Sequence, residues 1–199
     1  MYVGRIVVVG RTEGKSWAGY RVSSRSFPNR RAEVRGSSIL VSPLDSKDLA
    51  KNPYIAYNCI RTSGDVAVVA NGTQADMIME KVVDGLPPLD AIALSLVAYG
   101  YERDELDTPR IAGAIRDGEA WLGIAMKGEF RFKEIPLKDN DALMVATYEK
   151  TGFEPVAMSG KNASAVAKAA YDLAFERPVC SAAAFLRDEG FELAVYNPV

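Results

Sequence analysis

Strand-forming and helix-forming segments alternate in blocks along this chain of 199 residues. Strands are predicted from apolar or alternating runs at residues 2–10, 16–27, 37–42, 52–73, 110–126, 129–135, 141–148 and 191–197. Helices are predicted at residues 73–85, 86–100, 162–176 and 179–190, the first with Thr73 and Asp76 in an approximate capping-box arrangement. The first two helices separate the two main blocks of strands, and the last two precede the closing strand. This order restricts the chain to α+β architectures.

Two arrangements of these segments fit the pattern. Stacked sheets with helices on their outer faces would give a four-layer αββα sandwich, and a strand-rich run against a helical run would give a two-layer fold. The pattern slightly favours the four-layer sandwich. No linker, repeat or low-complexity tract interrupts the sequence, so residues 1–199 are expected to form one domain.

The segment "RIVVVGRTEGKS" at residues 5–16 resembles a phosphate-binding loop, which runs from a strand through Gly-Lys-Ser into a helix. Only three residues separate Gly10 from Gly14, whereas that loop needs four before its Gly-Lys pair. The following residues, 17–22, alternate as a strand does and cannot supply a helix N-terminus for a phosphate. The segment is therefore interpreted as a hairpin turn.

The chain contains no histidine. This excludes a Ser-His-Asp triad, a Cys-His pair and any histidine-ligated zinc site. Proton transfer in an enzyme of this composition must use Glu, Asp, Lys, Tyr, Cys or a terminal amine. The two cysteines, Cys59 and Cys180, lack metal-site spacing and are predicted to be unpaired thiols. A formal net charge of −2 offers no general attraction to nucleic acid.

The densest polar segment, "YRVSSRSFPNRR" at residues 20–31, suggests an anion site. On a strand, Arg21, Ser23 and Arg25 share one face, and two guanidinium groups flanking a hydroxyl can hold a phosphate. Asn29 and Arg30 add donors where the strand is expected to end. The alternative interpretation is an edge strand whose charges prevent aggregation.

Three other segments carry candidate residues. "YNCIR" presents Tyr57 as a proton donor or a ring for stacking, although a tyrosine in a half-buried strand usually serves packing. "YERDELDTPR" follows an apolar helix, and its composition favours a solvated loop. The alternative is that partial burial raises the pKa of a glutamate at this helix exit and makes it a general base. "VVANGTQAD" places Asn71 between a strand and a helix start, where an anion or amide can bind.

Taken together and in order, "MYVGRIVVVGR", "YRVSSRSFPNR", "YNCIR", "VVANGTQAD" and "ERDELDTPRIAG" resemble the archaeal-type IMP cyclohydrolases over nearly the whole chain. The resemblance implies the four-layer αββα sandwich of N-terminal-nucleophile hydrolases without self-processing, which agrees with Tyr2 following Met1. It also implies closure of 5-formamidoimidazole-4-carboxamide ribotide to IMP and water, the last step of purine synthesis. A cytoplasmic homo-oligomer, with a tetramer as the expected form, is implied as well.

The resemblance assigns candidate roles to individual residues. Arg30 is expected to stabilise the formyl oxygen, Glu102 to transfer the carboxamide proton, and Tyr57 to donate a proton or orient the substrate, with Asn58 as its alternative. The expected nucleotide-binding residues are Arg21, Ser23, Arg25, Asn71, Thr108 and Arg110. No cofactor, metal, membrane or nucleic-acid partner is expected. The competing hypotheses are a non-catalytic purine-nucleotide-binding protein and an amide hydrolase of the same fold class.

Overall fold

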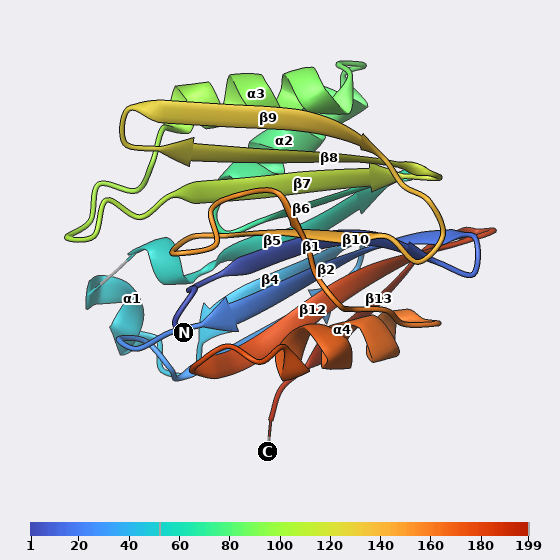
Figure 1. Ribbon diagram of the computed structural model, residues 1–199. Helices are drawn as coiled ribbons and strands as arrows, with labels where there is room; N and C mark the ends of the chain where they lie inside the picture. The colour runs from blue at the N-terminus through green and yellow to red at the C-terminus, as the bar shows by residue number, and fades with distance from the viewer. Residues whose placement is uncertain (52, 199) are drawn as a thin grey trace.

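The computed structural model describes residues 1–51 and 53–198, which form two antiparallel sheets with helices on the outer face of each (Figure 1). The six-stranded sheet has the order β11-β10-β1-β2-β12-β13, with β1 Ile6–Thr12, β2 Lys15–Ser23, β10 Ala142–Ala146, β11 Glu154–Pro155, β12 Pro178–Arg187 and β13 Gly190–Tyr196. The seven-stranded sheet runs in chain order, with β3 Arg30–Arg35, β4 Ser38–Pro43, β5 Tyr57–Ser63, β6 Val66–Ala70, β7 Arg110–Arg116, β8 Glu119–Met126 and β9 Glu129–Pro136. The predicted α+β class is confirmed.

The helices cover opposite sides of the sheet pair. α2 (Gln74–Val83) and α3 (Pro88–Tyr99) pack on the seven-stranded sheet, and α4 (Ala163–Asp172) packs on β2, β12 and β13 of the six-stranded sheet. The remaining helical segments are the short α1 (Lys47–Lys51) and the 3₁₀ turn η1 (Pro53–Ile55). No helix in the described part of the chain is long and apolar enough to cross a membrane.

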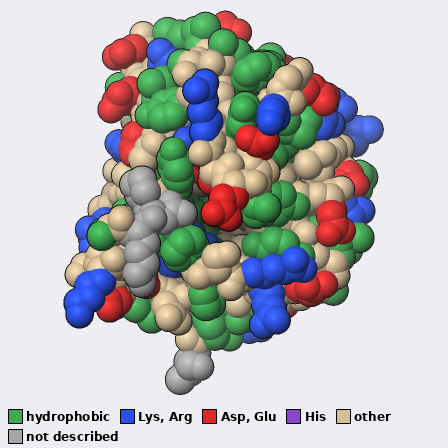
Figure 2. Space-filling model, turned by 90° about the vertical axis from the view of Figure 1, so that its left-hand side faces the viewer, with side chains coloured by type: hydrophobic (Ala, Val, Ile, Leu, Met, Phe, Trp, Pro, Cys, Tyr) green, Lys and Arg blue, Asp and Glu red, His purple; other side chains and the backbone are tan. Residues whose placement is uncertain are grey.

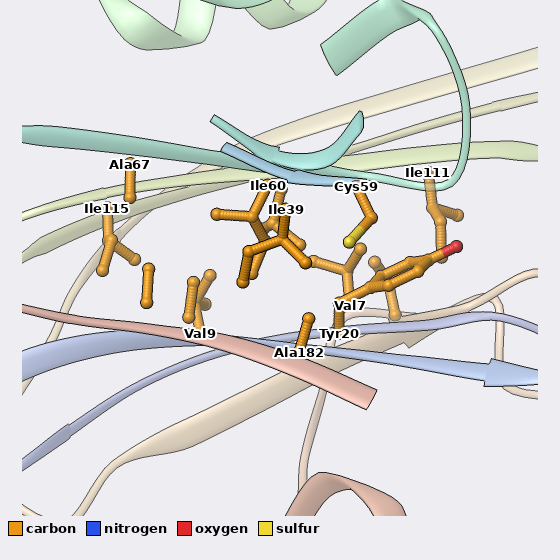
Figure 3. Packing of buried hydrophobic residues seen from close by; sticks show 14 of the residues in the cluster. Val7, Val9, Tyr20, Ile39, Cys59, Ile60, Ala67, Ile111, Ile115 and Ala182 are labelled. Carbon is orange, nitrogen blue, oxygen red and sulfur yellow. The ribbon is translucent and has the colours of Figure 1, made fainter. Parts of the chain in front are cut away.

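The main core lies between the two sheets. Val7, Val9 and Tyr20 of the six-stranded sheet meet Ile39 and Ile60 of the seven-stranded sheet, all fully buried (Figure 3). Two further clusters lie beneath α4 and beneath the α2–α3 pair. Most strands therefore bury both faces, which explains why many of them are continuous apolar runs without clear alternation.

The Gly-Lys-Ser segment is a tight hairpin between β1 and β2, as predicted. Thr12 pairs with Lys15, and the two turn residues, Glu13 and Gly14, have φ angles of 52° and 74°. Positive φ at both central positions is typical of the type I′ turn, whose twist matches that of antiparallel strands. The predicted hairpin at 110–126 and the helix at 86–100 are also confirmed.

The prediction of a helix at 179–190 is wrong, because this segment forms β12. β12 lies between β2 and β13, with Ala182 and Ala184 facing the inter-sheet core and Ala183 facing the cluster beneath α4. Alanine favours helices in isolation, but tertiary pairing overrides such a weak preference. Small side chains are needed here because both faces of the strand are covered.

The prediction of one long strand from residue 16 to 27 is also wrong at its end. β2 stops at Ser23, and the chain then turns before a separate strand, β3, which the sequence did not reveal. Of the strand predicted from residue 52, residues 53–55 are η1 and residue 52 lies outside the described residues.

The approximate capping box predicted at Thr73 and Asp76 does not form. The Thr73 side chain makes no capping hydrogen bond. Asp76 instead accepts hydrogen bonds from Asn58 and Arg61 on β5 and so fastens the first turn of α2 to the sheet. Asp76 therefore serves tertiary packing rather than the helix end.

Arg21 is fully buried beneath α4, where it joins the sheet to the end of that helix. Its guanidinium donates hydrogen bonds to the carbonyl oxygens of Leu173 and Phe175, and its Nε lies 3.0 Å from Ser23 Oγ. A cation at this position also complements the negative end of a helix dipole. Burial lowers the pKa of Arg21 to about 10, so the side chain stays charged at neutral pH.

Replacing Arg21 with Met should destabilise the fold, because two carbonyl oxygens lose a charged donor. We expect the free energy of unfolding to fall by roughly 2–3 kcal/mol, measured by chemical denaturation. Arg35→Met is the matched control, since Arg35 is exposed and its ion pair with Glu33 should contribute less than about 1 kcal/mol. Unchanged stability with weakened nucleotide binding would show instead that Arg21 belongs to the binding site.

Candidate functional site

A small cavity opens at the end of the molecule where β1 begins and the loop after α3 turns back to the sheet. Its volume is about 80 Å³, and an adjoining pocket of about 230 Å³ shares Ser26, Phe27, Arg30 and Ile55 with it. The cavity is lined by Tyr2, Arg5, Ser24, Ser26, Phe27, Arg30, Tyr54, Ile55, Glu102, Asp104, Leu106 and Tyr148. Figure 2 faces this end and shows acidic and basic side chains interspersed with hydrophobic ones.

Glu102 is brought to the cavity by the end of α3. The helix ends at Gly100, whose φ of 63° suits glycine, and the backbone N–H of Glu102 then donates to the carbonyl of Thr108 at 2.8 Å. Glu102 is only 3% exposed. Burial raises its pKa, against the opposing effects of Arg5 and Arg110. A carboxyl group with a raised pKa is suited to general acid–base chemistry near neutral pH.

The two oxygens of this carboxylate have different surroundings. Oε2 accepts a hydrogen bond from Nη2 of Arg5 at 3.3 Å. Oε1 lies 3.7 Å from Nη1 of Arg110 and has no hydrogen-bond partner among residues 1–51 and 53–198. An unsatisfied buried carboxylate oxygen is unusual and favours a functional interpretation.

Arg5 was not predicted as a site residue. It precedes β1 and reaches Glu102 across the boundary between the two sheets. Burial alone would lower the pKa of Arg5, but the charge of Glu102 and neighbouring tyrosines raise it, so the guanidinium remains protonated. The signal in the sequence was a lone arginine directly before the apolar run "IVVV".

Arg30 and Tyr57 lie on neighbouring parts of the same site. Arg30 is 6% exposed, lines both pockets, and donates from Nε to the carbonyl of Phe27 at 3.1 Å. The Tyr57 hydroxyl lies 2.7 Å from that of Tyr20, in the core between the sheets. Burial raises the pKa of Tyr57, although the nearby charges of Arg30 and Arg5 act in the opposite direction.

Two tyrosines missed by the sequence analysis form one wall of the cavity. Tyr2 stacks on Tyr148 with ring centres 5.8 Å apart, and Arg25 lies over Tyr2 with its guanidinium carbon 4.2 Å from the ring centre. The Tyr148 hydroxyl lies 2.6 Å from Thr108 Oγ1, which donates to Asp104 at 2.7 Å. Burial raises the pKa of Tyr148 and keeps it protonated. Arg25 contacts Tyr2 and Thr108 contacts Tyr148, so both residues lie beside the cavity.

The structure separates the other predicted binding residues from the cavity. Arg21 and Ser23 lie beneath α4, and Asn58 donates to Asp76 on the opposite side of its strand from Tyr57. Asn71 is buried, donates to the carbonyl of Pro109 and accepts from the backbone N–H of Ile111 at 2.8 Å. These residues are fully used by the fold. Of the weaker candidates, Arg110 approaches the Glu102 carboxylate, and the carbonyl of Thr108 accepts a hydrogen bond from the backbone N–H of Glu102.

The residues of the described chain that line the cavity include no cysteine. Over the described residues, no group of three or more His, Cys, Asp or Glu side chains is placed to hold a metal ion. Cys59 and Cys180 are both buried free thiols, as predicted, and burial raises the pKa of each. The polar groups that line the cavity are the Glu102 and Asp104 carboxylates, the Arg5 and Arg30 guanidinium groups, and the hydroxyls of Tyr2, Tyr54, Tyr148, Ser24 and Ser26.

Comparison with known proteins identifies the family to which this chain belongs. The family described as "IMP cyclohydrolase-like protein" matches residues 2–190. Proteins named IMP cyclohydrolase are 65% identical in Methanothrix thermoacetophila, over 100% of both chains, and 54% identical in Methanocella arvoryzae, over 99% of this chain and 98% of the relative. A third, from Methanococcus aeolicus, is 43% identical over 92% of this chain and 95% of its own. The chain belongs to the IMP cyclohydrolase-like family.

Proposed function

We propose that this chain is an IMP cyclohydrolase, which closes 5-formamidoimidazole-4-carboxamide ribotide to IMP with loss of water. The observation that carries the proposal is the buried Glu102 carboxylate, which lines a cavity together with Arg5 and Arg30, lies near Arg110, and keeps one oxygen free of hydrogen bonds from the described residues. Relatives with this name, up to 65% identical over the full chain, support it. The reaction needs a base, an oxyanion donor and an orienting pocket, all without histidine.

Ring closure begins when the carboxamide nitrogen attacks the formyl carbon. Glu102 takes a proton from that nitrogen as the new C–N bond forms, and the formyl oxygen gains negative charge. We assign stabilisation of this oxygen to Arg30, whose guanidinium lines the cavity. The formyl oxygen needs two protons to leave as water: protonated Glu102 returns the carboxamide proton, and the second is the proton of the formamido N–H, which is lost as the ring C=N bond forms. Glu102 is thereby restored to its starting state.

Tyr57 is assigned an orienting role. Its hydroxyl is held by Tyr20 in the inter-sheet core and lies close to Arg5 and Arg30. The residues that line the cavity include Tyr148 but not Tyr57. Holding the reacting groups coplanar and in contact is the larger task, because orientation can contribute about 7–11 kcal/mol in favourable intramolecular models.

The ribotide phosphate is assigned to the mouth of the cavity. Arg25 is more than half exposed, stacks on Tyr2 and pairs with Glu176 at 3.3 Å. Ser24 and Ser26, on either side of it in sequence, line the cavity and offer hydroxyl donors. A guanidinium with neighbouring hydroxyls is a common phosphate-binding set.

We further propose that the packed sheets and their covering helices are the four-layer sandwich of N-terminal-nucleophile-like proteins, folded as one domain over residues 1–199. The helices on both outer faces support this assignment. A cytoplasmic homo-oligomer, with a tetramer as the expected form, accords with the role in purine synthesis.

Adding the purified protein to the formamido ribotide should produce IMP, followed by its ultraviolet absorbance. Glu102→Gln and Arg30→Ala should each lower kcat by about 10²–10⁴-fold, because they remove the base and the oxyanion donor. Near-normal turnover of both variants at saturating substrate would refute the assignment. Nucleotide binding without any turnover by the wild-type protein would favour a non-catalytic binding protein.

The pH dependence should report the carboxyl group directly. A base must be ionised, so kcat/KM should fall as the pH drops through the pKa of Glu102. Because burial raises that pKa, the decline should begin at a higher pH than for an ordinary glutamate. The residual activity of Glu102→Gln should lack this acidic limb. An acidic limb identical in the wild-type protein and the variant would assign the titration to another group.

Arg25→Ala should chiefly weaken nucleotide binding. The loss of one exposed charged phosphate contact is expected to raise the Kd for IMP about tenfold, with kcat at saturation little changed. Isothermal titration calorimetry with IMP measures the effect. Arg35→Ala, which removes an exposed arginine from the far end of β3, is the control. Equal affinity of Arg25→Ala and the wild-type protein would move the phosphate site elsewhere.

A further inference from the structure

The "VVANGTQAD" segment contributes to the site through a residue that no sequence motif singled out. Gln74, the first residue of α2, is fully buried. Its side-chain nitrogen donates to Asn71 Oδ1 at 2.8 Å, and its oxygen accepts from Arg110 Nη1 at 3.0 Å. Asn71 is itself fixed by the backbone of Ile111 and Pro109. A rigid polar chain thus runs from β6 through Gln74 to Arg110.

The same nitrogen of Arg110 is also the one that faces Glu102. Nη1 lies 3.0 Å from the oxygen of Gln74 but 3.7 Å from Oε1 of Glu102, too far for a hydrogen bond. Nη1 carries two N–H groups, and the hydrogen bond from one of them to the Gln74 amide fixes the guanidinium at a position from which the other does not reach Oε1. This accounts for the otherwise unusual absence of a hydrogen bond at Oε1 within the described chain.

Two tyrosine rings and the backbone at Gly72 lie close to the Gln74–Arg110 contact. The guanidinium carbon of Arg110 lies 5.2 Å from the ring centre of Tyr99 and 5.6 Å from that of Tyr54. A Cβ on Gly72 would come within 2.6 Å of the Gln74 oxygen and 2.7 Å of Arg110 Nη1. Only glycine lets the backbone pass this close, so the segment is shaped around the Gln74–Arg110 contact.

We propose that Gln74 is a positioning residue that holds the Arg110 guanidinium back from Glu102, so that Oε1 of Glu102 stays free to accept a proton from the substrate. The inference rests on the proposed function for its catalytic meaning, whereas the hydrogen bond by which Gln74 holds Arg110 is a property of the structure itself. Gln74 acts through Arg110 and does not line the cavity.

The charged groups around Glu102 determine whether a substitution at position 74 raises or lowers the pKa of Glu102. The charged groups that act on it are Arg5 from β1, Arg110 from β7, Arg30 from β3 and Asp104 from its own loop, with the Tyr148 hydroxyl lining the same cavity. Without the Gln74 acceptor, Arg110 can close on Oε1 as a charge-assisted pair, which lowers the pKa of Glu102 and occupies the reactive oxygen. A second carboxylate at position 74 would have the opposite effect on that pKa.

The test compares Gln74→Met with Gln74→Glu. Met keeps the length of the side chain without a carbonyl acceptor, so the acidic limb of kcat/KM should move to lower pH by about one unit and kcat should fall about tenfold. Glu keeps an acceptor for Arg110 but adds negative charge, so the limb should move to higher pH. Asp76→Ala is the control, because it loosens α2 from β5 without touching Arg110.

A second measurement does not depend on turnover. Carbon-13 NMR of glutamate-labelled protein, with Glu102→Gln to identify the signal, should show the Glu102 carboxyl titrating at lower pH in Gln74→Met and at higher pH in Gln74→Glu. These shifts would support the proposal even if the protein made no IMP. Reduced stability with an unmoved Glu102 titration in both variants would overturn it and leave Gln74 a purely structural residue. If Gln74→Met does not fold, an unmoved titration in Gln74→Glu would overturn it equally.

Discussion

A carboxylate buried between guanidinium groups from two different sheets is the interaction on which this site depends. Glu102 and Arg110 belong to the part of the chain that follows α3 and enters the seven-stranded sheet, whereas Arg5 precedes the first strand of the six-stranded sheet. They meet because the sheets pack face to face through small and β-branched side chains. Burying a charge is costly unless it is paired, so the pairing and the packing require each other.

Because the Glu102 carboxylate is only partly hydrogen-bonded, one of its oxygens can still accept a proton. A fully hydrogen-bonded glutamate would have a depressed pKa and no free lone pair for a substrate proton. Here burial has the larger effect on the pKa of Glu102, and Arg5 and Arg110 moderate that effect without reversing its direction. A chain that contains no histidine can in this way obtain a base suited to near-neutral pH from a glutamate.

Local sequence patterns predicted most elements whose hydrogen bonds are local. The hairpin at Glu13 and Gly14 and the helix that ends at Gly100 depend on backbone preferences within a few residues, and both were found from the sequence. The wrong predictions concern segments whose structure depends on contacts with residues far away in the sequence. The alanine-rich β12 has the composition of a helix, but its neighbours β2 and β13 supply strand partners on both sides. Asp76, placed as a helix cap, is instead engaged by Arg61 from the adjacent strand.

The sequence by itself determined the α+β class, the hairpin at the Gly-Lys turn, the need for a base other than histidine, and the candidacy of Arg30 and Glu102. Only the tertiary structure decided that Arg5 pairs with Glu102, that Arg21 supports α4 beneath the sheet, and that Gln74 holds Arg110. The physical reason is distance along the chain. Arg5 and Glu102 are 97 positions apart, and Arg21 is 152 positions from Leu173, so no local periodicity records these contacts. They exist only after the two sheets and their helices have packed.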